Sequence, residues 1–390
     1  MTLPTGEISF SQVRDELEKM GMINLDDIDV RGLAEKLNGI ISMSDLQGKS
    51  AFHWAEILQA MMASDAVTGD FFGSSVALDG NRLVVGAMGR DDGGIRSRGK
   101  VYVYDWNGSA YVETTTVVAS DAVSDNQFGA SVALEGDRLV VGARNRDDYR
   151  GKVYVYVWNG TSYVEVSTLL ADDAVVRDFF GYAVALEDNR LIVGAVVRDE
   201  GGITDRGKVY VYDWNSSTNT YDEVTTLLAN DAVASDFFGS SVALEGNRLI
   251  VGARNRDEGG ITDRGKVYVY DWNSSTNTYD EVTTLLANDA VKGDFFGSSV
   301  ALDGNRLVVG AIGRDDGGIS NRGKVYVYVW NGTSYVETTT LLASDGVVAN
   351  DYFGSSVSLD GNRLVVGALS RDEGGIVNIG KVHVYDYIRL

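Results

Sequence analysis

Hydrophobic and polar residues alternate along most of the chain in short runs that end at Gly, Asn or Asp. In the run GKVYVYDW, Val101 and Val103 would point to one side of an extended chain. Tyr102, Tyr104 and Trp106 would point to the other side. Both faces are bulky and apolar, which is typical of a strand in a sheet covered on both faces. The pattern predicts an all-β protein built from such sheets.

A triplet of two bulky residues and a glycine, Phe-Phe-Gly in most copies, recurs along the chain. Each copy opens a unit of four strand-like runs, of the type GSSVAL, RLVVGA, GKVYVYDW and YVETTTLL. The turns D-G-N-R and N-G-T-S join successive runs as antiparallel hairpins. The triplets end at Gly73, Gly129, Gly181, Gly239, Gly297 and Gly354. This repetition predicts a six-bladed β-propeller of four-stranded antiparallel blades over residues 51–390.

The last unit ends after its third run, so the sixth blade needs an outer strand from elsewhere. Residues 54–67, WAEILQAMMASDAV, match the fourth run YVEVSTLLADDAV at residues 163–175 after a shift of one position. We expect residues 54–63 to supply the missing strand and to close the ring.

The composition narrows the possible partners. The chain has 390 residues, a formal net charge of −22 and no cysteine. Nucleic acid and anionic membrane surfaces would be repelled, and disulfides and thiolate metal sites are excluded. No segment approaches the roughly eighteen apolar residues of a membrane span, and MTLPTGEISF does not read as a signal peptide. We therefore expect no nucleic-acid partner and no membrane insertion.

Each triplet is followed by V-G-A, first at Val85–Ala87 and last at Val366–Ala368. This combination resembles the FG-GAP repeat of integrin-type β-propellers, and the resemblance covers nearly all of residues 51–390. Many FG-GAP repeats carry a calcium loop between the first two strands. Here that space holds only the D-G-N-R turn, whose single carboxylate cannot build a cage of six or more oxygens. We expect no cofactor, with calcium as the open alternative.

Residues 1–50 lie outside the repeat. The segments ISFSQVRDEL at 8–17 and ISMSDLQGKS at 41–50 look like a duplicated motif in which a serine caps a helix. DDIDVRGLAEKLNG between them predicts a short amphipathic helix, so that we expect a small, partly helical segment. LPTGEISFSQVRDEL followed by ISMSDLQGKS resembles N-terminal segments of virion proteins of tailed bacteriophages. The resemblance implies an attachment segment that binds other virion proteins.

Pairs of an arginine and an acid recur between the second and third runs. One role is to form ion pairs that hold this loop or link neighbouring blades. The other role is to bind a ligand or cation, with the Asp before each triplet as a further oxygen ligand. The candidate ligand-binding residues are Arg90, Asp91, Arg146, Asp147, Arg198, Asp199, Arg256, Asp257, Arg314, Asp315, Arg371 and Asp372.

Catalysis is disfavoured by the same repetition. Acid–base catalysis needs one asymmetric pair of carboxyl groups with separated pKa values, which six equivalent pairs do not provide. The two histidines, His53 and His383, offer neither a Ser-His-Asp triad nor a histidine metal site. We therefore expect no enzyme and no catalytic residue. The tryptophans that end most third runs could pack between strands or stack on sugars.

The leading hypothesis is a non-enzymatic structural protein of a tailed-phage virion. Its propeller would recognise a host-surface glycan or protein, or decorate the particle, as one of several copies. The alternatives are a propeller that only cements neighbouring subunits, a polysaccharide-acting enzyme that uses the central channel, and an integrin-like adhesin at a cell surface or outside the cell.

Overall fold

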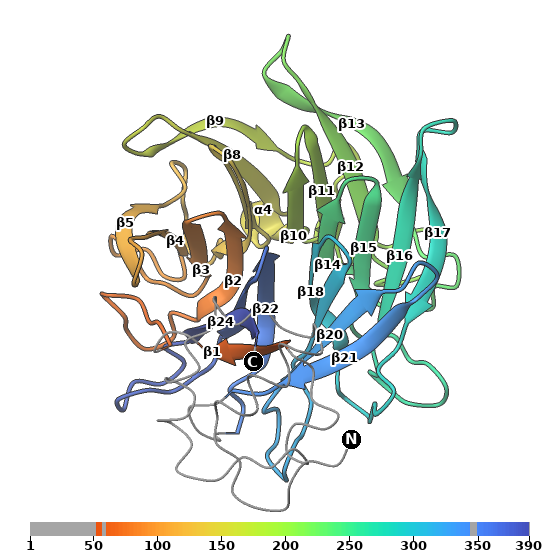
Figure 1. The fold of residues 1–390 in the computed structure, drawn as a ribbon. Helices are drawn as coiled ribbons and strands as arrows, with labels where there is room; N and C mark the ends of the chain where they lie inside the picture. The colour runs from red at the N-terminus through yellow and green to blue at the C-terminus, as the bar shows by residue number, and fades with distance from the viewer. Residues whose placement is uncertain (1–51, 57–59, 344–348, 390) are drawn as a thin grey trace, which may run out of the picture. The chain divides into compact units, whose positions relative to one another are not determined.

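The structure is a computed structural model that describes residues 52–56, 60–343 and 349–389. Figure 1 shows its strands grouped in four-stranded sheets around a central axis, and six such sheets are present. All neighbouring strands for which a register is given are antiparallel. The predicted six-bladed all-β propeller is confirmed. The expected partly helical segment and its attachment role fall on residues 1–50, outside the described residues.

Five blades each contain four consecutive strands. Blade 1 comprises β2 Phe72–Asp79, β3 Arg82–Ala87, β4 Lys100–Trp106 and β5 Tyr111–Val117. Blade 2 comprises β6 Phe128–Glu135, β7 Arg138–Ala143, the short α4 Arg146–Tyr149, β8 Lys152–Trp158 and β9 Tyr163–Leu169. Blade 3 comprises β10 Phe180–Glu187, β11 Arg190–Ala195, β12 Lys208–Asn215 and β13 Thr220–Leu227.

The remaining blades repeat this order. Blade 4 comprises β14 Phe238–Glu245, β15 Arg248–Ala253, β16 Lys266–Asn273 and β17 Thr278–Leu285. Blade 5 comprises β18 Phe296–Asp303, β19 Arg306–Ala311, β20 Lys324–Trp330 and β21 Tyr335–Leu341. Blade 6 comprises β22 Phe353–Asp360, β23 Arg363–Ala368, β24 Lys381–Arg389 and β1 Phe52–Glu56.

The first strand of every blade lies at the axis, where it contacts the first strand of each neighbouring blade. It also contacts the second strand of the blade before it. Two kinds of segment share one face of the propeller: the 2–3 loops, which join second and third strands, and the connections, which lead from one blade into the next. Phe237 N, at the end of a connection, and Phe238 N, at the start of β14, donate to Asp205 O and Arg206 O in the preceding 2–3 loop, at 3.3 and 3.1 Å. We call this side of the propeller the loop face.

The ring is closed by a strand from the beginning of the propeller. β1 pairs with β24, so the order of the sixth sheet is β1-β24-β23-β22. The Glu56 carboxylate lies 2.9 Å from His383 Nδ1, and Met61 N donates to Val382 O at 2.7 Å. The rings of Trp54 and Tyr387 lie 5.0 Å apart, which repeats the Trp–Tyr contact of the other blades with the two residue types exchanged. Among the described residues, no helix is long and apolar enough to cross a membrane.

The glycines of the repeat mark where the backbones of two blades meet. A Cβ on Gly142, in the V-G-A of blade 2, would overlap the carbonyl oxygen of Gly181 in the triplet of blade 3. It would also overlap Ser131 Oγ, which donates to the same carbonyl oxygen at 2.8 Å. The glycine of V-G-A in one blade therefore contacts the triplet glycine of the next blade at a distance that only glycine permits.

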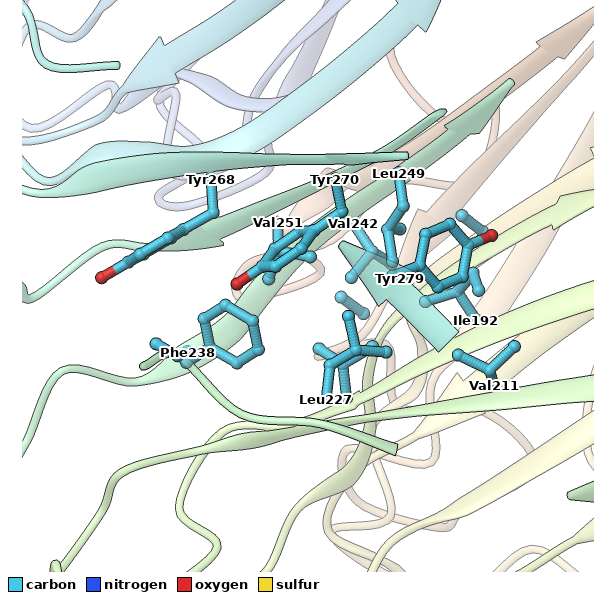
Figure 2. Packing of buried hydrophobic residues seen from close by; sticks show 14 of the residues in the cluster. Ile192, Val211, Leu227, Phe238, Val242, Leu249, Val251, Tyr268, Tyr270 and Tyr279 are labelled. Atoms are coloured by element: carbon cyan, nitrogen blue, oxygen red, sulfur yellow. The ribbon is translucent and has the colours of Figure 1, made fainter. Parts of the chain in front are cut away.

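Hydrophobic clusters fill the space between blades. In the cluster of Figure 2, Phe238 lies beside Tyr268 and Tyr270 of its own blade and faces Leu227 of blade 3. The rings of Phe238 and Tyr268 meet edge to face, with centroids 5.4 Å apart. The tryptophans pack at the edges of these clusters: the Arg190 guanidinium of blade 3 lies 3.8 Å from the ring of Trp272 in blade 4. This contact gives the tryptophan a packing role between blades.

Candidate functional site

In blades 1 to 5, an aspartate in the connection that enters the blade binds charged and hydroxyl groups of the loop face. In blade 4, the Asp231 carboxylate accepts from Lys266 Nζ at 2.7 Å, Tyr268 OH at 2.8 Å and Arg256 Nη2 at 3.3 Å. We call such an aspartate with its three donors an acid hub. The hub aspartates of blades 1 to 5 are Asp65, Asp121, Asp173, Asp231 and Asp289. The corresponding Asp345 of blade 6 lies outside the described residues.

The environment of the acid hub shifts the pKa values of its members in opposite directions. Burial alone would raise the pKa of Asp231, but the hydrogen bonds from Lys266 and Tyr268 and the charges of Lys266 and Arg256 hold it below its usual range. Burial and the Asp231 carboxylate raise the pKa of Tyr268. The hub is therefore an ionised carboxylate that accepts hydrogen bonds from neutral and cationic donors. Such an arrangement stabilises the fold.

The six predicted arginines lie in or beside these clusters rather than free on the surface. Arg256 Nη1 also donates to Asp236, the aspartate before the triplet, at 2.7 Å, and its side chain is only 10% exposed. Burial raises the pKa of Asp236 despite this partner. Arg371 likewise pairs with Asp351 in blade 6. Each arginine binds acids of its own blade, so the pairs form six separate clusters and do not converge on one site.

The acids of the predicted pairs are held by their own 2–3 loops in five blades. Asp257 Oδ1 accepts from the backbone N–H of Asp263 at 2.8 Å, which closes the loop of blade 4. The same contact is made by Asp91, Asp199, Asp315 and Asp372. In these blades the geometry fits the loop-holding role of the pair, and ligand binding by these pairs stays a prediction.

Blade 2 departs from this pattern because its 2–3 loop is contracted to DDYRGK. Asp147, Asp148 and Tyr149 adopt positive φ values of 54°, 59° and 64° in succession. L-residues rarely occupy this region, at a cost of about 1–2 kcal/mol each, and for a bulky residue it is an outlier. Asp147 instead pairs with its neighbour Arg146, with 3.1 Å between Oδ1 and Nε.

A hollow of about 790 Å³ lies over the contracted loop. Its walls come from the connection entering blade 2, the contracted loop and the connection entering blade 3. The lining residues are Val123, Ser124, Asp125, Asn126, Asn145, Asp147, Asp148, Tyr149, Arg150, Leu170, Ala171 and Ala174. Tyr149 and Leu170 are 45% and 47% exposed, although both are large and apolar.

The wall of the hollow also differs from the other blades in composition. Asn126 replaces the aspartate before the triplet. In the amide orientation that satisfies its hydrogen bonds, its side-chain oxygen accepts from Arg146 Nη1 at 3.3 Å and from Val123 N at 3.1 Å. The ring of Tyr149, which lines the hollow, lies 5.5 Å from that of Phe179. The lining of the hollow thus combines carboxylates and amides with an exposed aromatic ring.

This arrangement suits a neutral ligand that carries hydroxyl groups. Carboxylates accept hydrogen bonds from hydroxyls, and an exposed aromatic ring packs against the apolar face of a sugar ring. The lining carries three carboxylates, those of Asp125, Asp147 and Asp148, against the single guanidinium of Arg150, so the excess of negative charge disfavours an acidic ligand. Over the described ranges, no three His, Cys, Asp or Glu side chains are grouped so as to hold a metal ion.

Arg146 and Asp147 are the two predicted site residues that border this hollow or its wall. The predictions missed Tyr149, Asp125 and Leu170, which give the hollow its character. The available signal was the contracted loop: five units contain Gly-Gly in the 2–3 loop, and the second unit contains Asp-Tyr-Arg instead.

Known proteins that are similar to this chain share its repeats. The family described as FG-GAP repeat matches residues 56–104, 107–156, 163–212, 221–270, 279–328 and 335–385, which together make up more than half of the chain. Human integrin alpha-11 is 36% identical over 103 residues. That alignment covers 23% of this chain and only 8% of the integrin.

Proposed function

Because the chain belongs to the FG-GAP repeat family, we propose that it is a non-enzymatic recognition module whose blade 2 hollow binds a neutral carbohydrate of a host or cell surface. The observation that carries this proposal is the strained, exposed Tyr149 beside carboxylates in a hollow of about 790 Å³. Backbone strain persists where the surrounding structure enforces it, and it concentrates at binding sites. None of the other 2–3 loops contains an aromatic residue.

The repeated ring of six similar blades suits display rather than catalysis. The five regular blades use their loop-face charges to hold their own loops, which leaves blade 2 as the departure from symmetry. Binding in a shallow polar hollow would be weak for a single copy. We propose that several copies act together, so that avidity compensates for the weak individual site.

The setting we propose is the virion of a tailed phage, where residues 1–50 attach the propeller to other virion proteins. This part rests on the resemblance of residues 1–50, which precede the first FG-GAP match at residue 56. The alternative setting is a cell surface or the extracellular space, where the propeller would serve as an integrin-like adhesin. The carbohydrate site is the same in both settings.

A glycan array probed with the full chain tests the proposal. We expect binding to neutral glycans, and a loss of tenfold or more, equivalent to about 1.4 kcal/mol, in the Tyr149→Ala variant. Val377→Ala is the matched control, because Val377 is an exposed apolar residue of the blade 6 loop and is 49% exposed.

Three outcomes would contradict the proposal. If no glycan binds, the propeller is a cementing element without a carbohydrate ligand. If Tyr149→Ala binds as the parent chain does, the hollow is not the site. If the array glycans are cleaved, the chain is an enzyme.

A further inference from the structure

A second departure from symmetry lies where the propeller axis meets the loop face. The residue after each triplet is the third residue of the axial strand, and in four blades it is a serine: Ser74, Ser240, Ser298 and Ser355. The hydroxyl of Ser240 accepts from Arg254 N at 3.2 Å and donates to Gly252 O at 3.1 Å, which fastens the end of β15. In blade 3 this position holds Tyr182, a side chain too long to make that local contact.

Tyr182 lies between two arginines from the blades on either side. The guanidinium carbon of Arg144, which follows β7 in blade 2, is 4.9 Å from the centre of the Tyr182 ring. That of Arg254, which follows β15 in blade 4, is 5.3 Å from it. The sequence Arg-Asn-Arg-Asp occurs at residues 144–147 and 254–257, in the two blades that flank blade 3. The sister positions in the other blades carry Met88, Val196, Ile312 and Leu369.

These two arginines lack the acids that every predicted pair arginine has. Within residues 52–56, 60–343 and 349–389, no carboxylate forms an ion pair with Arg144 or Arg254. Arg144 Nε donates to Gln127 Oε1 at 2.8 Å, and its Nη2 lies 3.4 Å from Met88 Sδ. Arg254 Nε is buried and has no hydrogen-bond partner in the described part of the chain. Two like charges therefore face one another in a protein whose net charge is −22.

The electrostatic consequences are visible in both residue types. Burial, together with the charge of Arg254, lowers the pKa of Arg144. Burial would raise the pKa of Tyr182, but the charges of Arg254 and Arg144 lower it below its usual range. The cluster is thus short of negative charge, although the protein is acidic. A bound anion would supply what is missing.

We infer that Arg144, Arg254 and the Tyr182 hydroxyl form a binding site for an oxyanion, a phosphate or a carboxylate group, at the loop-face end of the axis. Guanidinium groups donate in a fixed fork that matches two oxygens of such a group. Their contact with the Tyr182 ring holds them in place, and the donors that Arg144 and Arg254 do not use inside the protein are left for the ligand. This site is separate from the blade 2 hollow and does not rest on the proposed carbohydrate binding.

Calorimetric titration of the full chain with inorganic phosphate and, separately, with sodium glucuronate tests the inference at constant ionic strength. We expect saturable binding of at least one probe, and at least a tenfold loss in Arg144→Met and in Arg254→Met. Methionine is chosen because Met88 occupies the sister position in blade 1. Binding of phosphate alone identifies a phosphate ligand, and binding of glucuronate alone or of both identifies a site that accepts the carboxylate of an acidic sugar.

A control and a second readout separate binding from folding. Lys292→Met removes a cation from an exposed position in the connection that enters blade 5, and should leave the titration unchanged. Without ligand, Arg144→Met should melt at the same temperature as the parent chain or higher, because it removes a like-charge repulsion. The inference is overturned if neither probe binds saturably, if the arginine variants bind as the parent does, or if Lys292→Met weakens binding equally.

Discussion

Blades 2 and 4 share the sequence Arg-Asn-Arg-Asp and the same acid hub, but they differ in the loop that follows. Blade 4 uses Gly259 and Gly260, with φ values of 62° and 79°, for much of the left-handed part of its loop. Blade 2 places Asp148 and Tyr149 in that conformation, with φ values of 59° and 64°. The comparison shows that the strand order and the acid hub are the same in both blades. Only the loop of blade 2 carries exposed side chains in a backbone conformation that lowers stability.

The largest effects should fall on features that the two blades share. Gly142→Ala in blade 2 and Gly252→Ala in blade 4 should each reduce the free energy of unfolding by about 3 kcal/mol, because the new Cβ overlaps the backbone of the next blade. Chemical denaturation measures both. Gly136→Asp is the matched control, since blade 3 already holds Asp188 in that turn with a φ of 53°. Unequal losses at Gly142 and Gly252 would mean that the blades differ in their cores as well as their loops.

The acid hubs should also respond alike. Tyr154→Phe and Tyr268→Phe each remove a buried hydroxyl that donates to a hub carboxylate, at 2.7 and 2.8 Å. Because the acceptor is charged, each should lower the free energy of unfolding by about 2 kcal/mol. A loss near zero in blade 2 alone would show that its contracted loop has also weakened its hub.

Backbone strain should separate the two blades. Asp148→Gly should stabilise the protein by about 1 kcal/mol, because glycine adopts positive φ without the steric cost. Gly259→Asp in blade 4 should destabilise it by a similar amount. Thermal or chemical denaturation of the pair checks the signs, and a destabilising Asp148→Gly would refute stored strain in the contracted loop.

Acid sensitivity gives a smaller effect. The folded-state pKa of Asp231 lies below its usual value of 3.8, so its contribution to stability is complete above that pH and is lost as the pH falls through the folded pKa. The stability difference between the parent chain and Asp231→Asn should therefore narrow below pH 3.8. Asp121→Asn in blade 2 should behave in the same way, because its pKa is lowered by the same kinds of donor. A difference that stays constant from neutral to acid pH would contradict the hub description.

Removal of divalent cations should have no effect on stability or binding. We expect a chelator to leave the melting temperature and the carbohydrate binding unchanged, since neither the D-G-N-R turns nor the blade 2 hollow provides a cage of oxygens for calcium. A chelator-dependent loss of stability, restored by added calcium, would identify a site that this account lacks.

Strand order and blade number could be predicted because the triplet, the V-G-A and the hairpin turns recur in each of the six units. The partners of Arg256 could not, since Asp231 and Asp236 approach it from a separate connection only once the blade is folded. The hollow was missed for a related reason. The sequence shows that the loop of blade 2 is shorter. It does not show which side chains of the neighbouring connections, such as Leu170, become exposed beside the loop.

Exchanging the loops of the two blades tests the central claim most directly. In one chain, the DDYRGK of residues 147–152 is replaced by the blade 4 sequence DEGGITDRGK, and in the other chain the reverse replacement is made in blade 4. Calorimetric titration with a neutral glycan selected on the array then compares both with the parent chain. The account predicts that binding is lost in the first chain and retained in the second. Undiminished binding by the first chain would show that blade 2 does not carry the site.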